Sequence, residues 1–143
     1  MAHNNLNIII ADDDNDDSAL LIEALVENGI DRSKIIVTPD GETLLSILPT
    51  YSKTPSLVFL DLNMPRKNGM KVLSEVKSNP ELRHIPILIL TTSNSKSDIN
   101  TCYELGGNTY FTKPFSYTEL MQLVRIIKLY WFETASMFNP SNA

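Results

Sequence analysis

Acidic residues follow two short apolar runs that are typical of buried strands. Asp12 and Asp13 come directly after Ile8-Ile9-Ile10-Ala11. Asp61 comes directly after Leu57-Val58-Phe59-Leu60. If these runs form neighbouring parallel strands, their carboxyl ends meet at one edge of a sheet, where open α/β folds bind ligands. Crowded carboxylates repel one another, so such a cluster needs either a cation or raised pKa values, and Mg²⁺ prefers such oxygen ligands. The three acids therefore predict a magnesium site.

Two further polar residues follow strand-like runs. Thr91 comes after Ile87-Leu88-Ile89-Leu90, and Lys113 comes before Pro114 at the end of the last such run. A hydroxyl and an ammonium beside carboxylates suit the oxygens of a phosphoryl group. An aspartate next to a bound metal can attack phosphorus and form an acyl phosphate. The pattern indicates phosphoryl chemistry.

Strand and helix patterns alternate along the chain and must position these residues. We expect strands at 6–11, 35–38, 57–60, 87–90 and 109–112. We expect helices at 16–27, 42–48, 70–77, 97–105 and 117–135. Asn15 is the expected N-cap of the first helix, and Pro49 is expected to end the second. Alternating strands and helices with short connections specify an α/β fold with a doubly wound, five-stranded parallel sheet.

Composition restricts the class of protein. The chain has 143 residues, of which 43% are hydrophobic and 20% charged, and its net charge is −5. These values predict one globular domain and argue against nucleic-acid binding, which needs basic patches. The single cysteine, Cys102, excludes an internal disulfide and favours a reducing compartment. Because we find neither a signal peptide nor an apolar membrane span, we expect a cytoplasmic protein with no membrane contact.

An ordered set of motifs spans residues 5–135 and consists of Asp12-Asp13, Asp61 with Met64-Pro65 and Gly69, Thr91, and Lys113-Pro114-Phe115. This set resembles the receiver domain of two-component response regulators. The resemblance implies a flavodoxin-like sheet with strand order 2-1-3-4-5. Residues 136–143 are expected to form a disordered tail.

The resemblance also implies roles for the acidic residues. Asp61 would accept a phosphoryl group from a phosphohistidine on a sensor histidine kinase. Asp13 and Asp61 would bind Mg²⁺ directly, together with the main-chain carbonyl of Asn63. Asp12 would act on the ion mainly through water.

Three other residues receive roles from the same resemblance. Lys113 would pair with one phosphoryl oxygen, and Thr91 would donate a hydrogen bond to another. Tyr110 occupies the switch-aromatic position and would turn inward when Thr91 is drawn to the phosphate, although an ordinary core aromatic is the alternative. The Lys113–Pro114 peptide bond is expected to be cis.

The acid run at 12–17 and the loop at 61–69 are similar to those of small single-domain regulators, some of which partner bacterial phytochromes or hybrid kinases. The predicted sheet and helices use the chain to about residue 135, so no DNA-binding domain fits. We therefore expect a stand-alone regulator, not a metabolic enzyme. Its output would pass through a downstream protein or a further phosphotransfer partner.

The predicted last helix carries two apolar stripes. The first comprises Leu120, Val124, Ile127 and Trp131, and it should pack on the sheet. The second comprises Leu123, Ile126 and Tyr130. Because nothing downstream covers the second stripe, we expect this helix to form a homodimer or partner interface.

Two other functions fit parts of the pattern. A phosphatase of the haloacid-dehalogenase type would use Asp12 as nucleophile and Asp14 as acid/base, followed by Thr91 and Lys113. That assignment leaves Asp61 without a role and lacks a late acidic pair. A receiver-like domain that binds partners without phosphorylation is the other alternative, and the intact acid set argues against it.

The remaining acids of the first loop have a simpler explanation. Asp14, Asp16 and Glu23 match positions of a calcium-binding loop that would begin at Asp12, but Asp17 stands where that loop requires glycine. We expect Asp16 and Asp17 to favour the positive end of the first helix dipole instead.

Overall fold

The structure is a computed structural model that describes residues 5–139. Its central feature is a five-stranded sheet in the order β2-β1-β3-β4-β5, in which all neighbouring strands are parallel. The strands are β1 (Asn7–Ala11), β2 (Ile35–Thr38), β3 (Ser56–Leu60), β4 (Ile87–Thr91) and β5 (Thr109–Thr112). The predicted doubly wound α/β fold and its flavodoxin-like strand order are confirmed, and each strand lies within one residue of its predicted bounds.

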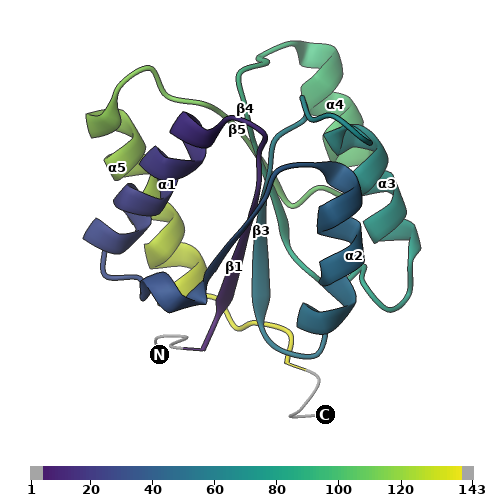
Figure 1. Ribbon diagram of the computed structural model, residues 1–143, viewed down its shortest axis with the longest axis horizontal. Coiled ribbons are helices and arrows are strands. Elements are labelled where there is room, and N and C mark those ends of the chain that lie inside the picture. The colour runs from purple at the N-terminus through teal and green to yellow at the C-terminus, as the bar shows by residue number, and fades with distance from the viewer. Residues whose placement is uncertain (1–4, 140–143) are drawn as a thin grey trace.

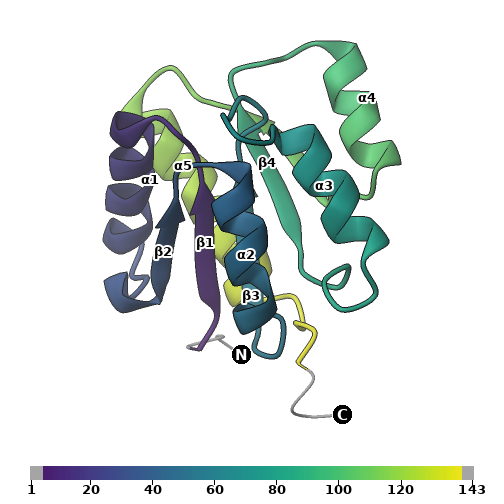
Figure 2. The same cartoon turned by 45° about the vertical axis from the view of Figure 1, so that its right-hand side comes forward.

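Helices cover both faces of the sheet. They are α1 (Asn15–Glu27), α2 (Gly41–Tyr51), α3 (Gly69–Ser78), α4 (Lys96–Glu104) and α5 (Tyr117–Ile127), with a 3₁₀ turn η1 (Arg32–Lys34) and a π-helical turn η2 (Lys128–Phe132). Figures 1 and 2 show α1 and α5 together on one face and α2, α3 and α4 on the other. Within residues 5–139, no helix combines the length and apolarity that crossing a membrane requires.

The core has two layers because side chains alternate across each strand. In β1, Ile8 and Ile10 pack toward α1 and α5, whereas Ile9 and Ala11 pack toward α2 and α3. The strands β3 and β4 are buried along their whole length. Buried on both faces, the central strands need the continuous apolar runs seen in the sequence. This rigid sheet fixes where each polar strand end lies.

The first helix begins one residue earlier than predicted. Asp14, not Asn15, is its N-cap, since the Asp14 carboxylate accepts hydrogen bonds from the amides of Asp16 and Asp17 at 2.9 and 3.1 Å. A carboxylate also complements the positive end of the helix dipole better than a neutral amide does. The prediction of Asn15 as the cap was therefore wrong.

Pro49 does not end the second helix, which continues to Tyr51. Proline lacks the N–H that would bond to the carbonyl of Leu45, but this loss falls in the final turn of α2. Burial of Leu44 and Leu48 holds the helix against the sheet. The hydroxyl of Ser52 then donates to the Pro49 carbonyl at 2.9 Å, which provides a partner for one of the last helical oxygens.

The last helix differs from prediction. Helix α5 ends at Ile127, and η2 follows, where amides bond five residues back; for example, the amide of Glu133 donates to the carbonyl of Lys128 at 3.2 Å. In the predicted tail, the Phe138 ring lies 4.2 Å from the His84 ring between centroids. Residues 140–143 of that tail lie outside the described residues.

The Lys113–Pro114 peptide bond is trans, since residues 5–139 contain no cis peptide bond. The predicted cis bond was therefore wrong. Trans is the lower-energy form of an X–Pro bond by about 0.5–1 kcal/mol. The trans chain still directs the Lys113 side chain to the acidic edge of the sheet, where its ammonium makes three ion pairs.

Candidate functional site

The carboxyl ends of β1 and β3 lie side by side and bring Asp12 next to Asp61. Ala11 is paired with Leu60 in the sheet, and the amide of Asp61 donates to the Ala11 carbonyl at 2.9 Å. Both aspartates follow directly on this pair, so the register of the two strands sets their separation. This edge lies where the strand order reverses between β1 and β3, the position at which open α/β sheets bind ligands.

Three carboxylates form a group that could hold a metal ion. Oxygen atoms of Asp12, Asp13 and Asp61 all lie within 4.8 Å of one another. Asp12 and Asp61 are buried, at 7% and 6% exposed, and Asp13 is exposed. Burial raises the pKa of Asp12 to about 6, and the nearby Asp61 charge adds to this, although hydrogen bonds from Lys113 and the Asp14 amide oppose it. A buried acid with a raised pKa and acidic neighbours fits a divalent cation, which would relieve the repulsion.

The Lys113 ammonium reaches the acids from the carboxyl end of β5. Its Nζ lies 2.8 Å from Asp12 Oδ2 and 2.9 Å from Asp61 Oδ2. A third ion pair, of 2.7 Å, links it to Asp17 Oδ2 on α1. Burial alone would lower the pKa of Lys113, but the hydrogen bonds to the three carboxylates outweigh it and hold the pKa above its ordinary value. The ammonium is therefore charged at any physiological pH.

Thr91 occupies the last position of β4 and is fully buried. Its hydroxyl donates a 2.8 Å hydrogen bond to Asp61 Oδ1. The amide of Asn63 donates to the same oxygen at 3.1 Å. The two oxygens of Asp61 thus have different partners, with neutral donors on Oδ1 and an ammonium on Oδ2.

Tyr110 lies on β5 with its ring half-buried beside the loop that follows β4. Its hydroxyl donates a 2.7 Å hydrogen bond to the carbonyl of Ser93. The Ser93 hydroxyl in turn donates to Asp98 Oδ2 at 2.6 Å, which ties the loop to the start of α4. The position of the Tyr110 ring is therefore coupled to the position of this loop. The loop begins directly after Thr91.

The loop between β3 and α3 closes around Asp61. Gly69 approaches it so closely that an added Cβ would lie 2.4 Å from the Asp61 carbonyl oxygen. Arg66 and Lys67 adopt positive φ angles of 52° and 100°, which non-glycine residues rarely do. Such strain persists where the surrounding structure enforces it, and functional sites are common examples.

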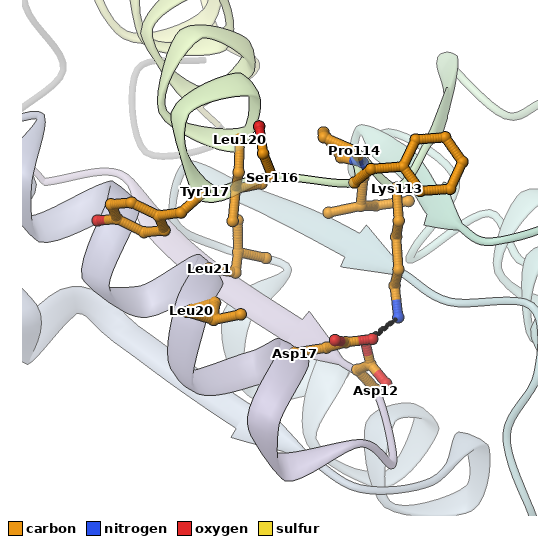
Figure 3. A pocket seen from close by; sticks show the side chains of 11 residues that line it. Asp12, Asp17, Leu20, Leu21, Lys113, Pro114, Ser116, Tyr117 and Leu120 are labelled. Atoms are coloured by element: carbon orange, nitrogen blue, oxygen red, sulfur yellow. Dashed lines mark hydrogen bonds and ion pairs between the residues drawn. The ribbon is translucent and has the colours of Figure 1, made fainter.

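A cavity of about 200 Å³ opens beside the site between α1 and α5. Asp12, Asp17 and Lys113 lie at one end of it, and Leu20 and Tyr117 lie on its helical walls (Figure 3). Its charged end is continuous with the acidic edge of the sheet. Lys113 is thus reached from the α1 and α5 face.

The structure brings together most residues singled out from the sequence, and Asp17 is the member that sequence reasoning missed. The sequence predicts that Asp17 interacts with the helix dipole, yet its carboxylate binds the ammonium of Lys113, 96 positions away in the sequence. Asp17 lies in the first turn of α1, which begins just after the carboxyl end of β1. Its place in that first turn was the available signal.

The fold and the acidic edge together define a class of protein, and comparison with known families identifies it. The family model of the response regulator receiver domain matches residues 8–125. This range is most of the chain, and the protein therefore belongs to the response regulator receiver domain family.

Individual relatives match over nearly the whole length. Response regulator Rcp1 from Synechocystis sp. is 37% identical over 135 residues, covering 91% of this chain and 91% of Rcp1. The crystal structure of the Mn²⁺-bound form of Rcp1 has a TM-score of 0.81 at 36% identity and covers 94% of this chain and 99% of that one. The structure of the phosphorylated cyanobacterial phytochrome response regulator RcpA has a TM-score of 0.83 at 34% identity, covering 92% and 96%.

Proposed function

We propose that this protein is a phosphoacceptor in which Asp61 receives a phosphoryl group from a phosphohistidine of a sensor histidine kinase. An oxygen of Asp61 attacks phosphorus, the P–N bond breaks, and the neutral imidazole of the kinase leaves. The observation that carries the proposal is the pairing of Asp61 with Lys113 and Thr91 beside an acidic cluster. The relation to Rcp1 and RcpA over most of the chain supports it.

We further propose Mg²⁺ as the ion of the acidic cluster. Asp13 and Asp61 would bind it directly with the Asn63 carbonyl, and Asp12 would act mainly through water. Oxygen donors of this kind match the preference of Mg²⁺, and Rcp1, a relative, has been crystallised with Mn²⁺. When bound, the ion neutralises charge on the transferring phosphoryl group.

The chain's own residues supply the remaining catalysis. Lys113 holds one oxygen of the incoming phosphoryl group, and the Thr91 hydroxyl moves from Asp61 Oδ1 to another. The domain would then also take a phosphoryl group from a small donor such as acetyl phosphate and would hydrolyse the product slowly. Because the phosphoryl group is carried by Asp61 of the protein itself, we propose a switch and not a metabolic enzyme.

The position of the Tyr110 side chain would change when Asp61 is phosphorylated. Its hydroxyl holds the Ser93 carbonyl at 2.7 Å in the resting form. If Thr91 shifts toward the phosphoryl group, the loop that carries Ser93 moves with it, and the Tyr110 ring can turn into the space released. The surface around α4 and β5 would change as a result.

Several partners follow from this function. We propose a sensor histidine kinase as donor, of the phytochrome or hybrid type, and a downstream protein or phosphotransfer partner as acceptor of the signal. Nucleic acid and membrane are not expected partners, given the net charge of −5. We propose a cytoplasmic location, where a lone free cysteine is ordinary.

A homodimer through α5 is the proposed assembly. Ile126, Leu129 and Tyr130 are 62%, 58% and 56% exposed, which is high for large apolar side chains. Ile126 and Tyr130 line a hollow together with Phe111 and Trp131. A second copy could cover this face, as apolar patches of this kind are usually covered by protein. Light scattering should show a mass that rises with concentration, and Ile126→Glu should reduce it; a constant monomer mass with and without phosphorylation contradicts the dimer.

The central test is phosphorylation by acetyl phosphate with Mg²⁺. We expect one phosphoryl mass addition that hydroxylamine removes, because hydroxylamine cleaves acyl phosphates. The addition should be absent in Asp61→Asn. If Asp12→Asn instead abolishes turnover of a phosphate ester and Asp61→Asn does not, the dehalogenase-type phosphatase is correct. A wild-type protein that takes no phosphoryl group would support the receiver-like domain without phosphorylation.

A further inference from the structure

The three ion pairs of Lys113 differ in how firmly the structure holds them. The side chains of Asp12 and Asp61 are each 8% exposed, whereas that of Asp17 is 37% exposed. Buried carboxylates cannot give up a counter-charge without a large desolvation penalty, but a half-exposed one can be solvated by water. Among the three, Asp17 is therefore the partner that Lys113 releases most easily.

An ammonium has three N–H donors, and all of those on Lys113 are directed at carboxylates. A phosphoryl oxygen that arrives on Asp61 needs one of these donors. The cavity beside Asp17 provides room for its carboxylate to turn away, since Asp17 and Lys113 both line that space (Figure 3). The pair between Asp17 and Lys113 is thus a contact of the resting form.

We infer that Asp17 is a positioning residue that opposes capture of the phosphoryl group by holding the Lys113 ammonium toward helix α1. This inference rests on the proposed function, and it adds a regulatory residue to that site. Competition for the ammonium and repulsion of the phosphoryl charges by the Asp17 carboxylate act in the same direction. Removing the charge of Asp17 should therefore favour the phosphoryl-bound form.

Beryllofluoride, a stable mimic of the phosphoryl group, measures this preference at equilibrium. Binding to the full chain with Mg²⁺ would be followed by ¹⁹F NMR of protein-bound fluoride. We expect Asp17→Asn to bind the mimic about three- to fivefold more tightly than wild type, the size of a partly exposed ion pair. Asp17→Glu keeps the charge and should return the affinity toward the wild-type value.

Asp16→Asn is the matched control. Asp16 lies in the same first turn and loses the same charge, yet within residues 5–139 no hydrogen bond or ion pair involves its side chain. We expect its affinity for the mimic to change by less than about twofold, as for exposed charges in general. Urea unfolding of each variant checks that folding is intact.

Each outcome decides the inference. If Asp17→Asn behaves like Asp16→Asn, the ion pair has no regulatory role. If Asp17→Asn binds the mimic more weakly, Asp17 assists capture and the inference is reversed. If the wild-type chain binds no mimic and accepts no phosphoryl group, the proposed function itself is wrong. If the wild type is phosphorylated but Asp17→Asn has unchanged affinity, only the inference about Asp17 is wrong.

Discussion

The hydroxyl of Thr91 donates a 2.8 Å hydrogen bond to Oδ1 of Asp61, although the two residues stand 30 positions apart in the sequence. Both side chains are buried, and they come from the ends of neighbouring parallel strands. The bond therefore links the position at which a phosphoryl group would be attached to the loop that leads to α4. A change in charge or size at Asp61 cannot leave Thr91 unaffected.

Replacing Thr91 by valine keeps the shape of the side chain and removes the donor. Because the buried Asp61 carboxylate then loses a hydrogen bond, we expect the free energy of unfolding to fall by about 1–3 kcal/mol. Urea denaturation would measure the loss. Thr112→Val is the control, since Thr112 pairs with Thr91 in the sheet but is exposed. Thr91→Ser should restore most of the stability, and a Thr91→Val variant as stable as Thr112→Val would refute this account.

The charge on Asp12 should destabilise the metal-free protein at neutral pH. Burial raises its pKa from 3.8 to about 6, so the folded protein binds the Asp12 proton more tightly than the unfolded chain does. The free energy of unfolding of wild type should therefore fall as pH rises from about 4 to about 6, relative to Asp12→Asn. In EDTA above about pH 7, we expect Asp12→Asn to be more stable by about 1–3 kcal/mol.

A metal ion should reverse that difference. If Mg²⁺ binds the folded acidic cluster as proposed, it should stabilise the fold by mass action, and the stabilisation should be larger in wild type than in Asp12→Asn. Thermal unfolding with and without Mg²⁺ measures both. Asp31→Asn is a suitable control, because hydrogen bonds from Ser33 lower the pKa of Asp31 and no gain in stability at neutral pH is expected from removing its charge. Equal Mg²⁺ responses in wild type and Asp12→Asn would contradict the assignment of Asp12.

Asp14 should matter more for stability than its neighbour Asn15. Its carboxylate accepts hydrogen bonds from two amides at the start of α1. Asp14→Ala leaves those donors without their cap, so we expect a loss of about 1 kcal/mol in the free energy of unfolding. Asn15→Ala should change it by only a few tenths. If urea denaturation shows a larger loss of unfolding free energy for Asn15→Ala than for Asp14→Ala, Asn15 is the N-cap.

Lys67 is strained in the loop that closes around Asp61. Its φ angle of 100° suits glycine, so Lys67→Gly should relieve strain and raise the free energy of unfolding by about 0.5–1 kcal/mol. The lost ion pair with Glu75 lies at the surface and offsets little of this gain. Lys71→Gly lies inside α3 and should instead cost about 1 kcal/mol, which makes it a control of opposite sign. Losses in both variants would show that the loop is not strained.

The order of elements and the identity of the acidic edge could be predicted from the sequence, because both depend on local patterns. Continuous apolar runs such as Ile8-Ile9-Ile10, rich in β-branched residues, favour buried strands, and an aspartate directly after such a strand lies at its carboxyl end. Parallel pairing then places all these ends on one edge. Asp12, Asp61, Thr91 and Lys113 were found in this way.

Local patterns were insufficient where partners come from distant elements. The continuation of α2 past Pro49 depends on burial of Leu48 against the sheet, which outweighs one missing hydrogen bond. The role of Asp17 depends on where Lys113 points after five strands have been placed in order. A charge at the start of a helix looks the same in sequence whether it faces water or an ammonium. The sequence by itself determined which groups reach the edge of the sheet, and only the tertiary structure decided which of them share Lys113, since that depends on distances between elements far apart in the chain.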